Sequence, residues 1–232
     1  TQLTHGELFA GISGFGLGFA RSGIETRWAV EIDPACRRVL TAHHPDAAIF
    51  EDVRDVGAHN LEPVDIITFG SPCQDLSVAG KRRGFDGERS GLYFEAIRVI
   101  AELRPALAIW ENVPGSLSSS GGRDFGAALD ALADIGAVDI AWSVLDAQYF
   151  GVAQRRRRVF VVADFRGERA GEKLALAHGL SGHPGPRRET GQGVTAGTAP
   201  SLTASGRGTS RVGESRGPDP VIPFSAPERA DT

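Results

Sequence analysis

The cysteine with the clearest chemical setting is Cys73, which closely follows the apolar run Val64–Phe69. This run predicts a buried strand, and ligands of open α/β sheets lie at the carboxyl ends of the strands. A glycine-rich basic stretch follows at 80–87, and nearby positive charge lowers a thiol pKa and raises the thiolate fraction. We therefore interpret Cys73 as a nucleophile, whereas Cys36, inside a predicted helix, is interpreted as structural.

A carboxyl group and a run of arginines accompany two further predicted strands. Glu111 directly follows the apolar run Ala106–Trp110, and Gln154–Arg158 leads into another apolar run. Because side chains alternate along a strand, Arg156 and Arg158 are expected to share one face. Each charge alone is most simply a surface residue. Together with the cysteine, they form a set suited to covalent catalysis at neighbouring strand ends.

A glycine turn and two acidic residues indicate a second ligand site. The first predicted strand, Gly6–Ala10, runs into a turn that contains Gly11 and Gly14. Glycines at a strand-to-helix turn let the backbone approach a ligand, although the spacing is not the G-x-G-x-x-G of dinucleotide-binding proteins. Glu31 follows the second strand, where an acid binds a ribose diol in dinucleotide folds. Asp52 follows the third strand, where a carboxylate can accept from an adenine amino group.

Short apolar runs alternate with longer amphipathic stretches up to Phe165. The predicted strands are Gly6–Ala10, Thr26–Val30, Ala48–Phe50, Val64–Phe69, Ala106–Trp110, Ile140–Leu145 and Val159–Ala163, and the predicted helices are Phe15–Ser22, Pro34–His43, Leu92–Leu103 and Phe125–Ile135. Asp33 is placed as an N-cap, with Pro34 at the first helical position. This alternation predicts an α/β fold whose parallel or mostly parallel sheet is covered by helices on both faces.

The composition changes after Phe165. Residues 166–232 hold 12 glycines and 7 prolines, a level that is typical of irregular or disordered chain. We therefore divide the chain into a catalytic domain over 1–165 and an irregular segment over 166–232. The second segment is interpreted as the start of a domain that this chain does not complete.

The bulk composition, with 41% apolar and 23% charged residues, is that of an ordinary globular protein. No run long enough to span a membrane and no secretory signal is recognised, and two cysteines without disulfide or metal-ligand spacing suit a reducing cytoplasm. We expect a cytoplasmic protein with no metal site. The net charge of −4 argues mildly against a nucleic-acid binder, but the clusters Lys81–Arg83 and Arg155–Arg158 can contact phosphates.

The chain resembles the bacterial and phage DNA cytosine-5 methyltransferase family from Leu3 to about Phe165. Six motifs carry the resemblance, in the family's order. They are the cofactor glycine motif at Leu8–Gly14, the ribose-binding acid Glu31 with Ile32, the adenine contacts Asp52 and Val53, the catalytic Pro-Cys motif at Pro72-Cys73-Gln74, the catalytic acid motif at Glu111-Asn112-Val113 and the Gln-x-Arg-x-Arg motif at Gln154–Arg158. Each motif alone is weak evidence, whereas their joint occurrence is highly specific.

The resemblance implies a Rossmann-like methyltransferase fold and S-adenosylmethionine as the cofactor, with S-adenosylhomocysteine as the product. The catalytic residues that it implies are Cys73, Glu111, Arg156 and Arg158. The cofactor-binding residues that it implies are Phe9, Gly11, Ser13, Gly14, Glu31, Ile32, Asp52, Val53, Pro72 and Leu92. The residues expected to contact nucleic acid are Gln74, Lys81, Arg82, Arg83 and Arg89.

The implied reaction is methylation at carbon 5 of a cytosine flipped out of double-stranded DNA, through a covalent bond from Cys73 to carbon 6. Glu111 would donate to ring nitrogen 3, a task near neutral pH that needs a raised pKa. Arg156 and Arg158 would hold the base carbonyl and Glu111. We expect a monomer without membrane association, and the resemblance leaves open whether a cognate restriction endonuclease accompanies it.

The chain departs from the family after Phe165. Neither the late Arg-x-x-Thr-x-x-Glu block nor the closing Gly-Asn-x-Val block is found, and most of a target recognition domain is missing. We therefore interpret the chain as C-terminally truncated. Three alternatives stay open: a cytosine-5 methyltransferase of transfer RNA, a non-catalytic fragment that binds cofactor or nucleic acid, and a dinucleotide oxidoreductase, which the glycine spacing disfavours.

Overall fold

The computed structural model describes residues 2–71, 91–167, 170–172 and 222–224 of the chain. The residues with predicted roles that lie outside these ranges are Pro72, Cys73, Gln74, Lys81, Arg82, Arg83 and Arg89. None of the helices in the described ranges has the length and apolar character needed to cross a membrane.

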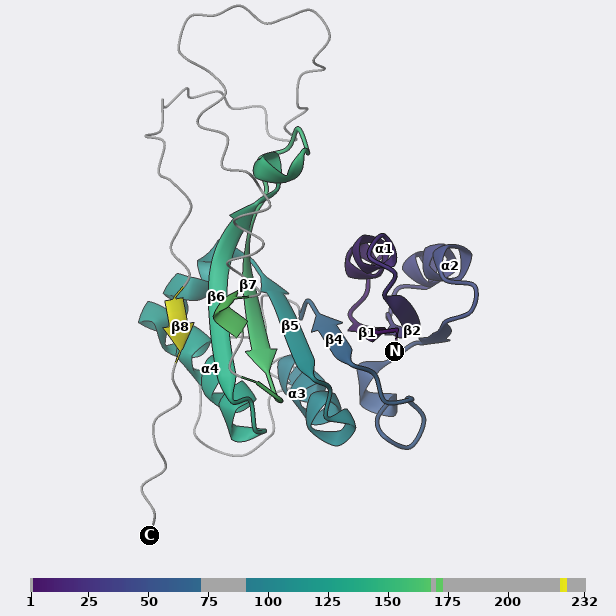
Figure 1. The fold of residues 1–232 in the computed structure, drawn as a ribbon, viewed down its shortest axis with the longest axis horizontal. Helices are drawn as coiled ribbons and strands as arrows, with labels where there is room; N and C mark the ends of the chain where they lie inside the picture. The colour runs from purple at the N-terminus through teal and green to yellow at the C-terminus, as the bar shows by residue number, and fades with distance from the viewer. Residues whose placement is uncertain (1, 72–90, 168–169, 173–221, 225–232) are drawn as a thin grey trace, which may run out of the picture.

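Within the described residues, eight strands form one sheet in the order β3-β2-β1-β4-β5-β7-β6-β8 (Figure 1). Their bounds are β1 Thr4–Leu8, β2 Glu25–Val30, β3 Ala48–Phe50, β4 Ile66–Phe69, β5 Leu107–Asn112, β6 Asp139–Asp146, β7 Arg157–Asp164 and β8 Ile222–Phe224. Neighbouring strands among β1–β5 are parallel. β7 runs antiparallel to β5 and β6, and β8 runs antiparallel to β6. The predicted α/β fold is confirmed, with an antiparallel end to an otherwise parallel sheet.

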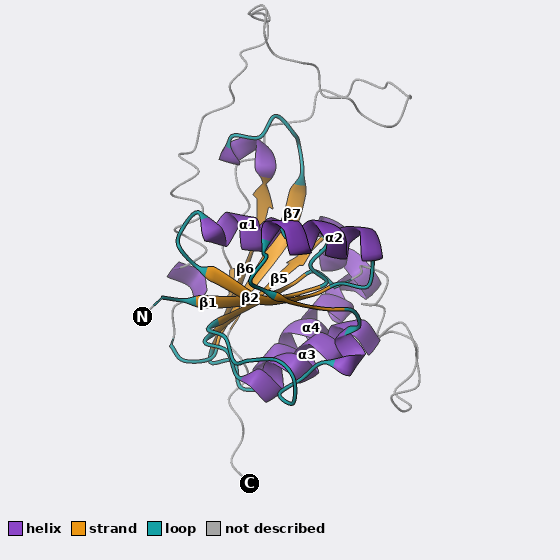
Figure 2. Ribbon diagram, turned by 90° about the vertical axis from the view of Figure 1, so that its right-hand side faces the viewer, coloured by secondary structure: helices purple, strands orange, loops and turns teal. Residues whose placement is uncertain are grey.

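Helices cover both faces of the sheet (Figure 2). The helices α1 (Gly14–Ala20) and α2 (Pro34–His43) lie on one face, and α3 (Gly91–Leu103) and α4 (Arg123–Asp134) lie on the other. The short 3-10 helices are η1 Val53–Asp55, η3 Pro114–Gly122 and η4 Ala147–Phe150. Because both faces are covered, all four residues of β4 are buried, as expected for a central parallel strand with a continuous apolar run.

All the predicted strands and helices agree with the structure to within two residues at each end. The helix Pro34–His43 agrees at both ends, and the Asp33 carboxylate accepts from the backbone N–H groups of Ala35 and Cys36. The predicted strand Gly6–Ala10 is wrong at its end. β1 stops at Leu8 because the next residue, Phe9, has φ 55°, which is incompatible with an extended strand.

Strand β5 extends beyond its predicted end at Trp110 and includes Glu111 and Asn112. These two residues pair with Phe160 and Val159 of β7, and this pairing keeps them in the sheet. Glu111 is therefore held by backbone hydrogen bonds on a strand and does not begin a loop.

Two short stretches of the segment 166–232 join the body of the fold. Ala170 is fully buried, and its backbone N–H donates to the Asp139 carboxylate over 2.7 Å. Strand β8 pairs with β6 along Trp142 to Ile140. At these two places the segment is ordered against the sheet, where the composition predicts irregular chain.

The core is built around two tryptophans on opposite parts of the sheet. Trp110 stacks between Phe69 and Phe125, with ring centroids 6.2 and 5.9 Å away. Trp28 is 1% exposed and fills the space above Gly6, where an added Cβ would lie 2.1 Å from the indole ring. These contacts fix β5 and β1, the strands that carry much of the candidate site.

Candidate active site

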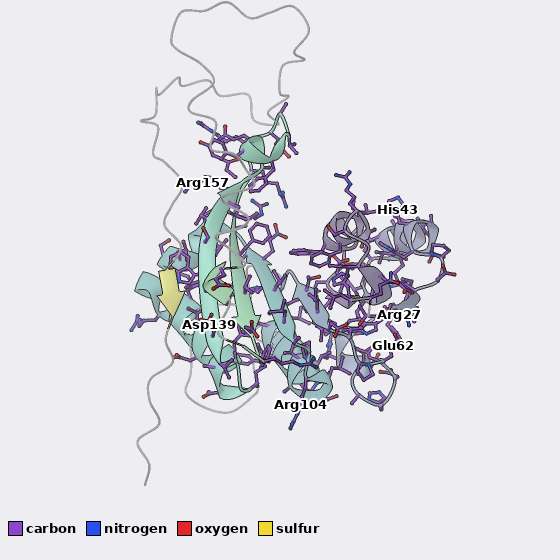
Figure 3. All side chains as sticks on the ribbon, viewed as in Figure 1. Arg27, His43, Glu62, Arg104, Asp139 and Arg157 are labelled. Atoms are coloured by element: carbon purple, nitrogen blue, oxygen red, sulfur yellow. The ribbon has the colours of Figure 1, made fainter. Side chains whose placement is uncertain are left out.

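The predicted site residues on different strands lie at one edge of the sheet. The carboxyl ends of β1, β2, β4 and β5 share this edge because these strands are parallel. The start of β7 meets the end of β5 because the two are antiparallel. Figure 3 shows Arg157, at the start of β7, and Asp139, at the start of β6, at opposite ends of this strand pair.

The carboxyl group of Glu111 is bound by two arginines. Its Oε1 lies 3.1 Å from Nε of Arg158 and 3.4 Å from Nη2 of Arg156. The structure thus brings together these three predicted residues. The Glu111 side chain is 27% exposed, and ion pairs of such exposure contribute only about 0–1 kcal/mol to stability. The arrangement therefore matters for where it places the carboxyl group.

The arginine run is held by Asp146 at the end of β6. Its Oδ1 accepts from the backbone N–H of Arg156 over 3.1 Å, and its Oδ2 accepts from Nε2 of Gln148 over 2.9 Å. The backbone N–H of Ala147 donates to the carbonyl of Arg156 over 3.0 Å. These bonds close the turn between β6 and β7, and so fix the position from which Arg156 reaches the carboxyl group.

The end of β4 passes directly beside the same carboxyl group. A Cβ placed on Gly70 would lie 3.6 Å from Oε2 of Glu111. Ser71 is buried, and its Oγ accepts from the indole N–H of Trp110 over 3.3 Å. The motif with Cys73 begins one residue later in the sequence, outside the described residues.

The glycine turn between β1 and α1 is joined to the end of β2 by Glu31. One carboxylate oxygen accepts from the backbone N–H of Gly11 over 2.7 Å, and the other accepts from Asp33 N–H over 2.9 Å. A Cβ at Gly11 or Gly14 would meet no atom within 4 Å. A carboxylate has about four acceptor positions, so Glu31 can still accept from a ligand that lies over this open turn.

Three residues predicted to contact the adenine, and Leu92, predicted to lie near the cofactor, differ in accessibility. Ile32 is 60% exposed, an unusual setting for an isoleucine, and Leu92 is partly buried against the core. The Asp52 carboxylate accepts from the backbone N–H and from Nε of Arg54. Val53 is buried, so its side chain packs in the core and its backbone is the part left to contact a ligand.

Arg98 on α3 fixes the turn that follows β3, a role that sequence reasoning missed. Its Nη2 donates to the backbone carbonyls of Val53 and Val56 over 3.0 and 2.9 Å. Glu102 binds Nη1 of the arginine and accepts from the backbone N–H of Ala58. The turn next to Asp52 is thereby attached to α3 by charge-assisted hydrogen bonds, the stronger kind.

Two residues that sequence reasoning missed, Glu7 and His44, lie under the glycine turn and contact Ser13. Ser13 is fully buried, and its Oγ lies 2.7 Å from the Glu7 carboxylate and 2.9 Å from Nε2 of His44. The Ser13 side chain therefore contacts the interior, and only its backbone can contact a ligand over the turn. An acid inside an apolar strand was the available sequence signal for Glu7, while His44 gave none.

Burial shifts the pKa values of Glu7 and of His5, two buried residues of β1. Burial raises the pKa of Glu7 to about 7, although the Ser13 hydroxyl and the Gly16 and Phe15 backbone amides oppose the shift. Burial, with a smaller contribution from His44, lowers the pKa of His5 to about 3. Both side chains are thus pushed toward their neutral forms.

A family model described as C-5 cytosine-specific DNA methylase matches residues 3–178. The chain belongs to this family. The matched residues include all the described strands from β1 to β7.

Several curated methyltransferases are similar in sequence to this family member. Type II methyltransferase M.Bsp6I of Bacillus sp. is 35% identical over 158 residues, covering 67% of the chain and 50% of the relative. M.AquIA of Picosynechococcus sp. is 35% identical over 181 residues, covering 69% of the chain and 71% of the relative. A phage P1 protein named DNA N-6-adenine-methyltransferase is 34% identical over 218 residues, covering 71% of the chain and 29% of the relative. The chain spans half or less of the length of the phage P1 protein and of M.Bsp6I.

Solved structures show the same fold. A prophage-encoded E. coli protein assigned as a DNA modification methyltransferase has a TM-score of 0.58 and 27% identity, over 75% of this chain and 48% of that one. The S. pombe Dnmt2 methyltransferase has a TM-score of 0.57 and 22% identity, over 72% and 53%, a likeness that concerns the fold alone.

The described residues fit the cofactor that this family implies, S-adenosylmethionine. The glycine turn is open over Gly11 and Gly14, and Glu31 offers acceptor positions beside it. Ile32 presents an exposed apolar surface suited to the face of a purine ring. A turn, an acid and an apolar surface at adjacent strand ends are the features that a bound nucleoside requires.

Proposed function

We propose that this chain transfers a methyl group from S-adenosylmethionine to carbon 5 of a flipped-out cytosine in DNA, with Cys73 as the nucleophile. The observation that supports it most directly is the Glu111 carboxyl group, bound by Arg156 and Arg158 beside the end of β4. Cys73 follows Gly70 by three residues. The proposal therefore assigns a nucleophile to the sheet edge that carries the acid and the two cations.

The cysteine and the acid have complementary roles in this proposal. The Cys73 thiolate attacks carbon 6 of cytosine and forms a sulfur–carbon bond, which makes carbon 5 nucleophilic. Glu111 hydrogen bonds to ring nitrogen 3 and stabilises the charge that develops there. Because both arginines bind Oε1, we assign the contact with the base to Oε2, which faces Gly70.

The covalent bond is then broken by elimination. When bound, S-adenosylmethionine supplies the methyl group that carbon 5 takes. A solvent base removes the carbon 5 proton, the electrons of that bond restore the double bond between carbons 5 and 6, and Cys73 leaves as a thiolate. Arg158 and Arg156 hold Glu111 throughout, and one of them also contacts the base carbonyl.

The remaining assignments follow the same proposal. The cofactor would lie over the glycine turn, with Glu31 at the ribose, Ile32, Asp52 and Val53 at the adenine, and Phe9, Pro72 and Leu92 around it. The nucleic-acid contacts are assigned to Gln74, Lys81, Arg82, Arg83 and Arg89. Residues 1–165 form the catalytic domain, and 166–232 begin a target recognition domain. The type II class of the relatives favours a search for a cognate restriction endonuclease.

The decisive experiment is methyl transfer from labelled S-adenosylmethionine into a mixture of genomic DNA and transfer RNA, followed by identification of the labelled base. Label in 5-methylcytosine of DNA supports the proposal. Label in transfer RNA assigns the chain to RNA, and label in N6-methyladenine agrees with the name of the phage P1 relative. No label overturns the proposed activity for this chain and favours a fragment that binds without catalysis.

A matched pair of cysteine variants tests the nucleophile. Cys73→Ser is expected to abolish methyl transfer and leave cofactor binding largely intact. Cys36→Ser is the control, because Cys36 lies in α2 and burial raises the pKa of its thiol, which disfavours the thiolate. Equal activity of Cys73→Ser and the unmodified protein would exclude Cys73 as the nucleophile.

A further inference from the structure

A line of hydrogen-bonded side chains under the glycine turn has no part in the proposed reaction. It runs from Glu7 in β1 through Ser13 in the turn to His44, the residue that directly follows α2. Glu7 and Ser13 are 3% and 0% exposed. The end of α2 thus meets β1 and the turn that follows it at one hydroxyl group, 31 residues away from His44 in the sequence.

The backbone of Ser13 is in a conformation that serine rarely adopts. Its φ and ψ are 66° and 58°, in the left-handed region that favours glycine. Such residues persist when surrounding contacts determine their position. The two hydrogen bonds of the Ser13 hydroxyl are those contacts, and the same backbone forms the glycine turn.

The direction of the hydrogen bonds follows from the chemistry of the three groups. A hydroxyl has a single hydrogen, and an ionised carboxylate only accepts. When Glu7 is ionised, Ser13 donates to it, so His44 must carry its proton on Nε2 and donate to Ser13. When Glu7 is protonated, it can donate to Ser13, and the hydroxyl can then donate to an unprotonated Nε2. The state of Glu7 therefore sets the tautomer of His44.

Gly16 in α1 lies close to the same hydroxyl. A Cβ on Gly16 would lie 2.2 Å from Oγ of Ser13 and 2.9 Å from both Nε2 of His44 and Oγ1 of Thr26. The start of α1 is therefore packed tightly against this hydroxyl. At the other end of α2, Glu31 and Asp33 join the helix to Gly11. Both ends of α2 thus contact the glycine turn.

We propose that His44 is a positioning residue for S-adenosylmethionine, which acts through Ser13 to hold the glycine turn in the conformation that the cofactor requires. This inference rests on the proposed function for the identity of the cofactor. Glu7 is the partner of the Ser13 hydroxyl at the buried end of the line, and His44 is the partner at the other end. Above the pKa of Glu7 the carboxylate accepts and His44 is the donor.

The test is titration of the full chain with S-adenosylmethionine. His44→Leu removes the donor and is expected to lower the affinity roughly tenfold, the usual effect of one lost hydrogen bond. His44→Gln keeps an N–H group near the Nε2 position and is expected to stay within about threefold of the unmodified protein. His43→Leu is the control, because His43 is exposed at the end of α2 (Figure 3).

Two further measurements separate positioning from general packing. Ring nitrogen shifts in NMR should show the Nε2–H tautomer of His44 above the pKa of Glu7. Ser13→Gly adopts the left-handed backbone freely, so it should retain more affinity than Ser13→Ala. This comparison decides the matter if His44→Leu does not fold.

The outcomes distinguish the inference from the proposed function. If the unmodified chain does not bind S-adenosylmethionine, the proposed function fails first. If it binds and His44→Leu binds equally well, or if Ser13→Ala and Ser13→Gly bind alike, the positioning role of His44 is overturned.

Discussion

The buried carboxyl group of Glu7 makes a quantitative prediction for the variant Glu7→Gln. The side chain is 3% exposed, and burial raises its pKa from 4.5 to about 7. At about 1.36 kcal/mol for each pKa unit, this shift corresponds to about 3 kcal/mol. Glutamine occupies a similar volume, can accept from Ser13 and does not titrate.

The sign follows from the direction of the shift. Between pH 4.5 and 7, folded Glu7 holds its proton while the unfolded chain has released it. Its contribution to stability is therefore fully present below pH 4.5 and is lost as the pH rises through 7. The stability of Glu7→Gln minus that of the unmodified protein is expected to rise by about 3 kcal/mol between pH 4 and pH 8. The lowered pKa of His5 makes stability rise with pH, which is the opposite direction. This effect cancels in the difference because both proteins contain His5.

The assay is urea unfolding of both proteins at a series of pH values, with the free energy of unfolding compared at each pH. The extra amide hydrogens of glutamine change the free energy of unfolding by the same amount at every pH. The prediction therefore concerns only how the difference between the two proteins changes with pH. Glu51→Gln is the control for the substitution itself, since the Glu51 side chain is 66% exposed. A flat difference curve for Glu7→Gln would refute the claim that the fold holds Glu7 in a neutral form.

Three further variants test other contacts. Arg158→Met removes the closer partner of Glu111 and should reduce methyl transfer by at least about 100-fold. The free energy of unfolding in urea should change by under about 1 kcal/mol. A comparable loss of activity and of stability would indicate a structural role. Arg98→Met leaves two backbone carbonyls without their donor, so it should cost about 2 kcal/mol in thermal unfolding and weaken cofactor binding in a titration. Gly6→Ala should cost at least about 2 kcal/mol in urea unfolding, because its Cβ would overlap the Trp28 indole. Combining it with Trp28→Leu should cost less than the sum of the two single changes, and strict additivity would contradict this overlap.

The parts of the fold that local sequence patterns determine were predictable. Asp33 and Pro34 mark the start of α2, and the side-chain cap of the structure is the one that this pair predicts. The apolar run Val64–Phe69 predicts the buried strand β4, which the structure places at Ile66–Phe69. In both cases, the deciding residues lie within a few positions of one another.

The parts that depend on distant contacts were not predictable. An apolar run such as Val159–Ala163 indicates a strand but not its direction, so the antiparallel pairing of β7 had no sequence signal. His44 gave none either, because its partner Ser13 is 31 residues away in the sequence. The grouping of Glu111 with Arg156 and Arg158 was expected from alternation along a strand, and the structure confirms that both arginines reach it.

The glycine turn carries several unfavourable features. Of the four described non-glycine residues with positive φ, Phe9 and Ser13 lie in this turn. Arg104 lies where α3 ends, a common place for the left-handed conformation. Buried Glu7, with its raised pKa, adds a further cost at neutral pH. Costs of this kind are retained where function needs a defined geometry.

The contacts that offset these costs do not depend on a ligand. Glu31 binds the backbone of Gly11, and His44 and Glu7 bind the hydroxyl of Ser13. A turn that is already held in place loses little further freedom when the cofactor binds, and this raises affinity. We therefore expect the backbone N–H of Gly11, which donates to Glu31, to be protected from hydrogen exchange before the cofactor is added. Protection that appears only with the cofactor would mean that the ligand, and not the hydrogen bond from Gly11 to Glu31, orders this part of the turn.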